Sequence, residues 1–381
     1  MSYYDGSMDY STNDTSLPPV YLFITSNLNP FIFVVISLAG LIGNGLVIFC
    51  LLYFTNLKTV PNVYILNLAV IDLFFLLGLP LMAYQYHFHD WPFGVVLCKF
   101  ANGMDVVNQY GSAWTLVAMS ADRFTAVVYP LSSMQRRTRS CARMVCTVVV
   151  VWSFVLGAFN WIFATVVSFQ VDDSGKEEQF CMLDIPANLT SMHIIYSAFN
   201  FTFGFAIPLA AILFFYMSIF YIMQTNDFYF RSNAKTAAQR ASKRVAVLTI
   251  AVIVVFFICW MPYYTVQFKL LLQDMRNEGY TISLSVIQQL SIALCYMNSL
   301  FNPFVYTFIG ENFRKNLAKL FCYGARNLNR GRSGRDSSSY TRSTVKLQPL
   351  KRHKTKATYY PSDVTIDVAN ERNNNTATTA T

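Results

Sequence analysis

The sequence predicts an all-α fold, a seven-transmembrane helix bundle followed by a short amphipathic helix eight. Three observations support this prediction. The 381-residue chain is 54% hydrophobic and only 13% charged, whereas ordinary soluble domains are about 25% charged. Seven apolar segments are each long enough to cross a bilayer, which takes about 20 residues in a helix. The connections between them alternate in charge, as expected when they alternate between the two sides of a membrane.

The seven predicted spans follow one another along most of the chain. They cover Phe31–Phe54, Asn62–Tyr86, Val95–Tyr129, Met144–Phe169, His193–Gln224, Arg244–Leu272 and Ser283–Ile309. Four spans contain a proline, at Pro80, Pro208, Pro262 and Pro303. Neighbouring helices in a membrane can satisfy the carbonyl groups that a proline leaves unpaired, so kinked spans are expected.

The charge of the connections predicts the orientation in the plasma membrane. No Lys or Arg precedes Lys58, and further basic residues gather in the connections after spans three and five. Acidic residues gather at the N-terminus and after span four. The positive-inside rule then places the N-terminus outside the cell and the C-terminus in the cytoplasm. The net charge of +9 therefore reflects topology and does not indicate nucleic-acid binding.

The sequence divides into four regions. Residues 1–30 are predicted to be an extracellular tail, 31–310 the seven-helix transmembrane domain, 311–322 an amphipathic helix on the membrane surface, and 323–381 a disordered cytoplasmic tail. Between Glu311 and Cys322 the apolar residues recur at a helical spacing, and the basic residues suit the inner leaflet. Cys322 is a palmitoylation candidate, with a free thiol as the alternative.

Other modification sites follow from the predicted topology. Asn13 and Asn188 begin glycosylation sequons on the predicted outer side. Serines and threonines between Ser337 and Thr344 lie among arginines. Phosphorylation there would add about −1.5 to −2 charges at each site and could recruit arrestin, although ordinary disordered composition explains the segment equally well.

The third span carries charged residues at membrane depth. Asp105 lies near its start, and the pair Asp122 and Arg123 lies about 27 Å further on at 1.5 Å per residue. Such residues cost several kcal/mol in a membrane and are functional-site candidates by default. One carboxylate then faces an external ligand and a second charged site faces the cytoplasm, which is the layout of a signal-transducing receptor.

Short motifs occur in order, at least one in each span. They are Gly43-Asn44, Asn67 to Asp72, Cys98 with Asp122-Arg123-Phe124, Trp152, Pro208 with Tyr216, Phe256 with Cys259-Trp260-Met261-Pro262, and Asn302-Pro303 with Tyr306. On this ordered set, the chain resembles the rhodopsin-like (class A) G-protein-coupled receptors from Phe31 to Cys322.

Local matches narrow the resemblance to one group of receptors. Leu77-Gly-Leu-Pro80, Trp91-Pro-Phe-Gly94 and Asp105-Val-Val-Asn-Gln109 are most similar to the somatostatin and opioid receptors and their allatostatin-C-like relatives. This resemblance implies an extracellular neuropeptide ligand and heterotrimeric G proteins of the Gi/o type as partners.

Asp105 is the leading candidate for a ligand contact, because a carboxylate in a partly dry pocket favours a cationic group. Gln109 shares its helix face one turn on. The resemblance implies that this pair receives a basic side chain of the peptide and that Tyr296 holds the carboxylate. Further candidates are Gln85, Tyr263, Tyr264 and Gln267. The alternatives are an internal hydrogen bond for Asp105 and simple packing for the others.

Two further groups are expected within the bundle. Cys98 and Cys181 both fall on the predicted outer side and should form a disulfide, with two free thiols as the alternative. Five polar residues fall at mid-membrane and need each other, water or an ion. They are Asp72, Asn108, Ser112, Asn298 and Asn302. The resemblance implies an allosteric sodium ion among them, with a network of waters as the alternative.

The resemblance also implies an activation switch. Trp260 lies on the Pro262 kink beneath the ligand, with Phe256 one turn inward, and a shift there would swing helix six. The residues expected to rearrange below it are Asp122, Arg123, Tyr216, Asn302, Pro303 and Tyr306. The chain departs from the family pattern at Phe124, in place of a tyrosine, and at Ser242, near where some members carry an acid. A strong ion pair from Arg123 to helix six is therefore doubtful, but Asp122 can still pair with Arg123.

Other functions fit the sequence less well. An opsin needs a lysine in span seven, which has none. An amine receptor would also use Asp105 but typically has serines on helix five, where this chain has Asn200, Phe201 and Gly204. A transporter or channel would show internal repeats or a polar pore stripe. An enzyme would need a paired nucleophile and base, metal-ligand spacing or a phosphate loop, and none is evident.

Overall fold

The computed structural model describes residues 19–55, 57, 59–129, 133, 135, 137–170, 177–185, 191–225, 237–276 and 281–309. The predicted surface helix at 311–322, Cys322, the sequons at Asn13 and Asn188, and the tail at 323–381 lie outside these residues. The Tyr306 side chain is also outside the description, although its backbone lies in a helix. The predictions for these parts therefore remain predictions.

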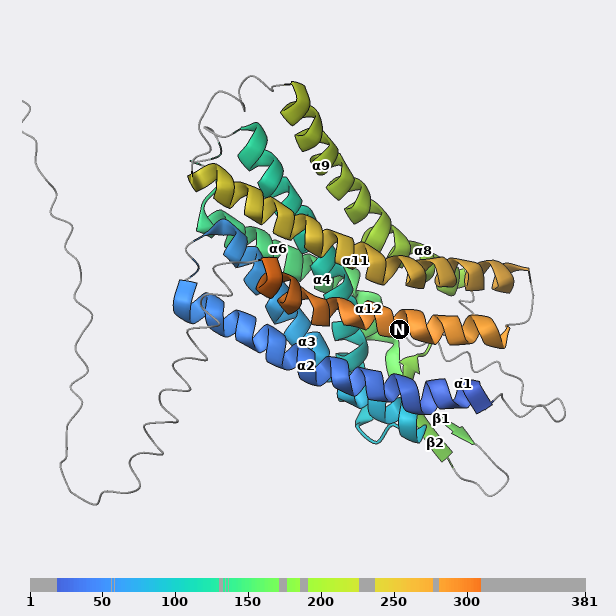
Figure 1. Ribbon diagram of the computed structural model, residues 1–381. Coiled ribbons are helices and arrows are strands. Elements are labelled where there is room, and N and C mark those ends of the chain that lie inside the picture. Colours follow the sequence, from blue (N-terminus) through green and yellow to red (C-terminus); the bar gives the residue numbers. More distant parts are fainter. Residues whose placement is uncertain are drawn as a thin grey trace, which may run out of the picture. The chain divides into compact units, whose positions relative to one another are not determined.

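Helices form the seven predicted spans (Figure 1). The first span is α1 (Pro19–Phe23), the π-helical turn η1 (Ile24–Leu28), α2 (Asn29–Cys50) and the turn η2 (Leu51–Thr55). The second and third are α3 (Val60–Phe88) and α4 (Gly94–Val128), and the fourth is α6 (Arg139–Leu156) with the short α7 (Ala158–Phe163). The fifth is α8 (Ser191–Phe201), the π-helical turn η4 (Thr202–Ala206) and α9 (Ile207–Thr225). The sixth and seventh are α11 (Ala237–Met275) and α12 (Ile282–Ile309).

The first helix begins earlier than its hydropathy suggests. It starts at Pro19 rather than at Phe31, and a proline suits the first turn because an N–H there has no helical partner. Polar residues such as Ser26 and Asn29 lower the hydropathy of this stretch, yet Asn29 is fully buried and donates to Gln289 of α12. The helical segment therefore extends into the region predicted as the extracellular tail.

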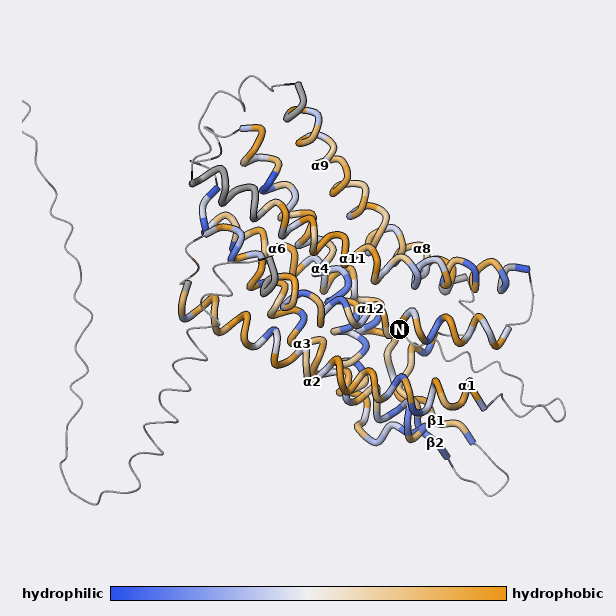
Figure 2. Tube along the Cα trace, viewed as in Figure 1, coloured by the Kyte–Doolittle hydropathy of each residue, from blue (hydrophilic) through white to orange (hydrophobic). Residues whose placement is uncertain are grey.

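The third span, α4, differs from the others in hydropathy. Among the described residues, six helical segments are long and apolar enough to cross a membrane by length and composition, and α4 is not one of them. Figure 2 shows hydrophilic residues along α4. Its neighbours α3, α6 and α9 surround it, and 19 of its 35 residues are buried. Because protein covers it, α4 can carry the polar residues from which the candidate sites are built.

Packing between neighbouring helices forms one main core. The helix α2 packs against α3 and α12, and α11 packs against α12. The core includes Phe33, Leu76, Leu116 and Phe256. Large apolar side chains elsewhere are exposed, such as Phe214 of α9, which is 64% exposed. Such exposure is expected where a helix faces lipid.

The kink in the fifth span has a specific hydrogen-bond partner on α4. In the turn η4 the N–H of Ile207 donates to the carbonyl of Thr202, five residues back. The same pattern would pair the next carbonyl, that of Phe203, with residue 208, which is a proline without an N–H. The indole Nε1 of Trp114 donates to this carbonyl at 3.1 Å. A neighbouring helix thus satisfies the carbonyl group that Pro208 leaves unpaired.

The prediction for the fourth span was wrong at its outer end. The helix stops at Phe163, and Ala164–Gln170 forms strand β1 instead of continuing to Phe169. Strand β1 pairs antiparallel with β2 (Glu177–Leu183). The run Thr165-Val-Val167 is β-branched and favours a strand, but a short apolar run shows no period that separates a strand from a buried helix. The all-α bundle therefore carries one β-hairpin, at the end of the bundle where α1 begins (Figure 1).

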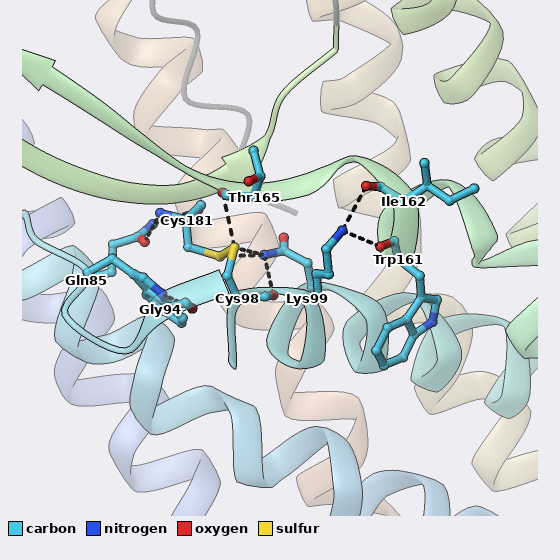
Figure 3. Close-up of a disulfide and its surroundings, with 10 residues drawn as sticks. Gln85, Gly94, Cys98, Lys99, Trp161, Ile162, Thr165 and Cys181 are labelled. Atoms are coloured by element: carbon cyan, nitrogen blue, oxygen red, sulfur yellow. Dashed lines mark hydrogen bonds between the residues drawn. A yellow bond between two sulfur atoms is a disulfide. The ribbon is translucent and has the colours of Figure 1, made fainter. Parts of the chain in front are cut away.

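A lysine on α4 stabilises the place where the fourth span ends. Lys99 Nζ donates to the carbonyls of Trp161 at 2.8 Å and Ile162 at 2.9 Å (Figure 3). The last carbonyls of a helix lack helical partners, and a cation near them is favourable. This contact gives two carbonyls at the end of the fourth span a hydrogen-bond donor just before strand β1 begins.

Candidate functional site

A disulfide attaches the hairpin to the N-terminal end of α4. Cys98 and Cys181 are bonded, with a Cα–Cα distance of 5.4 Å (Figure 3), which confirms the predicted pair. Asn102, one turn along α4, donates to the Cys181 sulfur at 3.0 Å. The bond fixes β2 over the helices that carry the predicted ligand contacts.

Gln85 holds the same strand from α3. Its Oε1 accepts from the Cys181 N–H at 2.8 Å, and its Nε2 donates to the Cys181 carbonyl at 3.2 Å (Figure 3). The side-chain amide therefore pairs with β2 as a neighbouring strand would. Sequence reasoning proposed Gln85 as a ligand contact, whereas the structure places it as a support of the hairpin and only 6% exposed.

Asp105 and Tyr296, which the sequence analysis paired, are found at the same cavity. Both line a small cavity between α3, α4 and α12, with Asn102 and Phe75 among its other walls. Asp105 is half-buried, and Tyr296 is 7% exposed. A carboxylate in such surroundings interacts strongly with a cation, because the apolar walls screen its charge less than water does.

Tyr263, Tyr264 and Gln267 line a second, larger cavity of about 180 Å³. It lies between α8 and α11, with Leu183 of β2 also at its wall. Most of its lining is apolar, including Phe201 and Phe268. Because ligand pockets usually span about 300–1,000 Å³, this cavity has room for one part of a ligand. The predicted ligand contacts thus divide between two cavities.

Gln109 lies in the interior and links α4 with α11. Its Nε2 contacts the Tyr264 hydroxyl, which in turn donates to the Asn200 carbonyl at 3.2 Å. Gly204 allows this contact, because a Cβ there would come within 2.7 Å of both Gln109 and Tyr264. Gln109 is 1% exposed, so it supports a wall of the larger cavity through Tyr264.

Trp260 lies among the aromatic residues of the candidate pocket. Its ring centroid is 6.0 Å from that of Tyr263 and 5.9 Å from that of Phe256. Pro262 follows it inside α11. The Trp260 indole nitrogen is buried and has no hydrogen-bond partner in the described part of the chain. These aromatic contacts, edge-to-face at Tyr263 and tilted at Phe256, extend from residues that line the larger cavity towards the middle of the bundle; they are called the aromatic stack below.

Asp72 is the centre of a buried polar cluster. It is fully buried and accepts hydrogen bonds from Asn108, Ser299 and Asn302, each at 2.8 Å. Ser112 lies one turn from Asn108 on α4, and Asn298 one turn from Asn302 on α12. Among the described residues, no Lys or Arg forms an ion pair with Asp72. The structure therefore joins predicted members on three helices and adds Ser299.

The charged pair at the other end of α4 is formed as predicted. Arg123 Nη2 lies 2.5 Å from Asp122 Oδ2, and both residues are buried. The Tyr216 hydroxyl lies near Ser120 and Arg123. Asn302 and Pro303 lie within α12, where the Pro303 ring is so close to Gly43 of α2 that a Cβ there would approach within 3.0 Å.

Sequence reasoning missed three residues that the structure places at these sites. Ser299 follows Asn298 and precedes Asn302 by three residues, so helical spacing from Asn302 could have found it. Arg137 bonds Asp122 from the connection after α4, but loop geometry cannot be read from spacing. Trp114 bonds the Phe203 carbonyl, and the missing N–H of Pro208 was the signal for such a donor.

Comparison with known proteins assigns the family. Residues 43–306 match the model of the 7 transmembrane receptor (rhodopsin family). The chain is 30% identical over 322 residues to somatostatin receptor type 2 of Mus musculus, covering 84% of this chain and 83% of the relative. It is 34% identical over 296 residues to melanin-concentrating hormone receptor 1 of Homo sapiens, covering 76% of this chain and 79% of the relative.

The somatostatin relative agrees with the resemblance seen in the motifs, whereas likeness to melanin-concentrating hormone receptors was not anticipated. These relatives are receptors and not enzymes, in agreement with the sequence prediction. With the family match covering most of the helical bundle, the chain belongs to the rhodopsin family of seven-transmembrane receptors.

Proposed function

We propose that this protein is a plasma-membrane receptor for an extracellular basic peptide and signals through heterotrimeric G proteins of the inhibitory Gi/o class. The observation that carries the proposal is the half-buried Asp105 carboxylate in a cavity within the helical bundle. A charge-assisted hydrogen bond there would bind a Lys or Arg of the ligand. Relatives named as receptors for somatostatin and melanin-concentrating hormone support a peptide ligand.

The larger cavity supplies the second contact. Its apolar lining, with Tyr263, Tyr264 and Gln267, suits an apolar or aromatic side chain that carries one polar group. A peptide with a basic residue next to an aromatic residue would engage both cavities. Asn200 and Gly204 stand where amine receptors typically carry serines and offer no hydroxyl group; the hydroxyl groups that helix five brings to this cavity are those of Ser197 and Thr202.

Ligand binding would change the bundle through the aromatic stack. Displacement of Tyr263 or Trp260 would alter the bend at Pro262 and so the position of the other end of α11. Arg123, Tyr216 and Tyr306 would then rearrange at the cytoplasmic side, where the G protein binds. A ligand that prefers the second arrangement shifts the population towards it. Phosphorylation of the tail beyond residue 323 would add the negative charge that arrestin recognises.

A peptide screen tests this function. Cells that express the receptor are treated with neuropeptides, including somatostatin-like and allatostatin-C-like cyclic peptides, with biogenic amines alongside. We expect a basic peptide to lower stimulated cyclic AMP, and pertussis toxin to abolish the effect, because the toxin blocks Gi/o. Cells without the receptor are the control. A response to amines alone, or none from a receptor confirmed at the surface, would contradict the proposal.

The Asp72 cluster fits an allosteric sodium ion. The side-chain oxygen atoms of Ser112, Asn298 and Asn302 are buried and have no hydrogen-bond partner among the described residues. The Asp72 carboxylate, which accepts from Asn108 and Asn302, places a negative charge close to them. Hard cations take oxygen ligands of these kinds. A bound sodium ion would supply positive charge to Asp72, and these side chains would hold it between α3, α4 and α12.

Sodium should therefore lower agonist affinity. Replacing choline chloride by sodium chloride at constant ionic strength should weaken agonist binding about five-fold or more, a common size for coupling between two sites. Asp72→Asn should remove this dependence, because the charge that attracts the ion is lost. Competition binding on membranes measures both affinities. An equal sodium effect in the wild type and the variant would show that the ion acts elsewhere.

A further inference from the structure

Two arginines share the Asp122 carboxylate. Arg123 donates to Oδ2 at 2.5 Å. Arg137 donates from Nε to Oδ1 at 2.8 Å and from Nη2 to Oδ2 at 2.7 Å. Arg137 therefore makes the two-pronged contact that suits a guanidinium and a carboxylate, while Arg123 makes a single hydrogen bond.

The backbone around Arg137 holds it in this position. Its N–H donates to the Ser133 carbonyl at 2.8 Å. The next residue, Thr138, caps α6 by accepting from the Cys141 N–H at 3.2 Å. The Arg137 side chain is 26% exposed, against 6% for that of Asp122. A loop residue thus reaches a buried carboxylate from a fixed point beside a helix start.

The two other arginines that the structure describes near this connection, Arg139 and Arg143, do not share the contact. Arg139 is exposed, and the Arg143 side chain donates to the Arg139 carbonyl and the Ser140 hydroxyl. The Tyr64 ring of α3 is buried near Asp122. Among the described residues, Arg123 and Arg137 are the only cations paired with Asp122.

This arrangement changes what happens when Arg123 leaves. If Arg123 were the only partner, its departure would leave Asp122 as a buried charge without a counter-ion, which is strongly unfavourable. With Arg137 present, the carboxylate keeps the two hydrogen bonds that it accepts from Arg137. The positive charge of Arg137 beside Arg123 also repels it. The first effect lowers the free energy of the state in which Arg123 is released, and the second raises that of the paired state, so both make the release less costly.

We propose that Arg137 is a positioning residue that keeps Asp122 neutralised and so makes the release of Arg123 easier on activation. The inference rests on the proposed function, in which Arg123 moves towards the G protein. Arg137 then favours signalling, unlike a contact that merely holds the inactive state. The absence of an acid at Ser242 in the sequence makes Asp122 the main partner of Arg123.

The first test compares Arg137→Gln with Arg139→Gln in nucleotide-exchange assays on membranes, normalised to receptor number. Arg137→Gln should reduce agonist potency about ten-fold, as expected for an unpaired buried charge in the active state. Arg139→Gln removes the same charge two residues away and should leave potency unchanged. Arg137→Lys should fall between them, because it retains the charge without the two-pronged contact.

A double-mutant cycle assigns the effect to the carboxylate. In an Asp122→Asn background there is no charge to neutralise, so adding Arg137→Gln should change potency by less than about two-fold. Raised basal exchange in Arg137→Gln would overturn the proposal, because it would mean that Arg137 stabilises the inactive state. Equal losses in Arg137→Gln and Arg139→Gln would also overturn it.

A spin-label measurement separates this inference from the proposed function. Labels at Tyr53→Cys and Val247→Cys, both exposed positions, report the position of α11 without ligand or G protein. Cys141→Ser removes the exposed thiol among the described residues, and Cys322→Ser removes the cysteine that lies outside them. Arg137→Gln should shift the distribution of distances between the two labels towards the distances of the inactive state and make it narrower. An unchanged distribution would overturn the role of Arg137, whatever peptide or G protein the receptor uses.

Discussion

The Asp105→Asn receptor should lose agonist potency by about a hundred-fold while it still reaches the cell surface. The substitution keeps the size of the side chain and removes its charge. A buried charged hydrogen bond between partners typically contributes 2–5 kcal/mol, and about 3 kcal/mol corresponds to a hundred-fold change. Competition binding with the peptide found in the screen measures its affinity for the variant, and cyclic-AMP assays measure its potency.

Asp184→Asn is the matched control for Asp105→Asn. Asp184 ends the hairpin region and is exposed, so its loss removes one negative charge from the same side of the bundle. Such a charge steers a basic peptide, and its effect should be small and reduced by salt. If both variants lost the same agonist potency, Asp105 would act through long-range attraction of the peptide and not through a direct contact. Unchanged potency in Asp105→Asn would exclude it as the anchor.

Gly103→Ala should destabilise the receptor by about 2 kcal/mol. A Cβ at Gly103 would come within 2.3 Å of the Trp161 ring, and that ring is stacked on Phe154 with centroids 5.8 Å apart. Overpacking of this kind costs about 1–3 kcal/mol, which outweighs the helix propensity gained from alanine, about 1 kcal/mol. The unfolding midpoint of the solubilised receptor should fall by on the order of 5 °C.

Gly45→Ala provides the control for Gly103→Ala. A Cβ at Gly45 has no atom within 4 Å, so alanine there should leave stability unchanged or raise it slightly. A thiol-reactive dye follows unfolding through the buried Cys50, Cys146, Cys259 and Cys295. Equal midpoints for the two variants would contradict the packing of Trp161 against α4.

The sequence predicted well what depends on helical periodicity. The seven spans follow from apolar length. Once the spans are placed, the Cys98–Cys181 bond follows from the predicted side of the membrane, and the meeting of Asp72 with Asn108 and Asn302 follows from their shared depth. The end of the fourth span could not be predicted in this way, because a short run such as Thr165-Val-Val167 fits the pattern of a buried helix and of a strand equally well. The β-hairpin is defined by its pairing with Glu177–Leu183, a non-local contact that hydropathy does not report.

Side-chain roles were harder to predict than positions. Gln85 lies on the expected helix, yet both ends of its amide bond the Cys181 backbone. Arg137 was grouped with other basic residues of a cytoplasmic connection, and only the three-dimensional path of the chain after α4 brings it to Asp122. Charge on a loop indicates topology, but the partner of each charge depends on backbone geometry.

The polar character of α4 has a consequence for biosynthesis. A segment with Asp105, Asp122 and Arg123 gains little by entering lipid on its own, because charged residues oppose insertion. Its stable position requires α3, α6 and α9 around it. We therefore expect stable insertion of α4 to depend on α6 and α9, which emerge from the ribosome after it. Substitutions that weaken these helix contacts would then reduce the amount of receptor delivered to the cell surface before they alter how the delivered receptor signals.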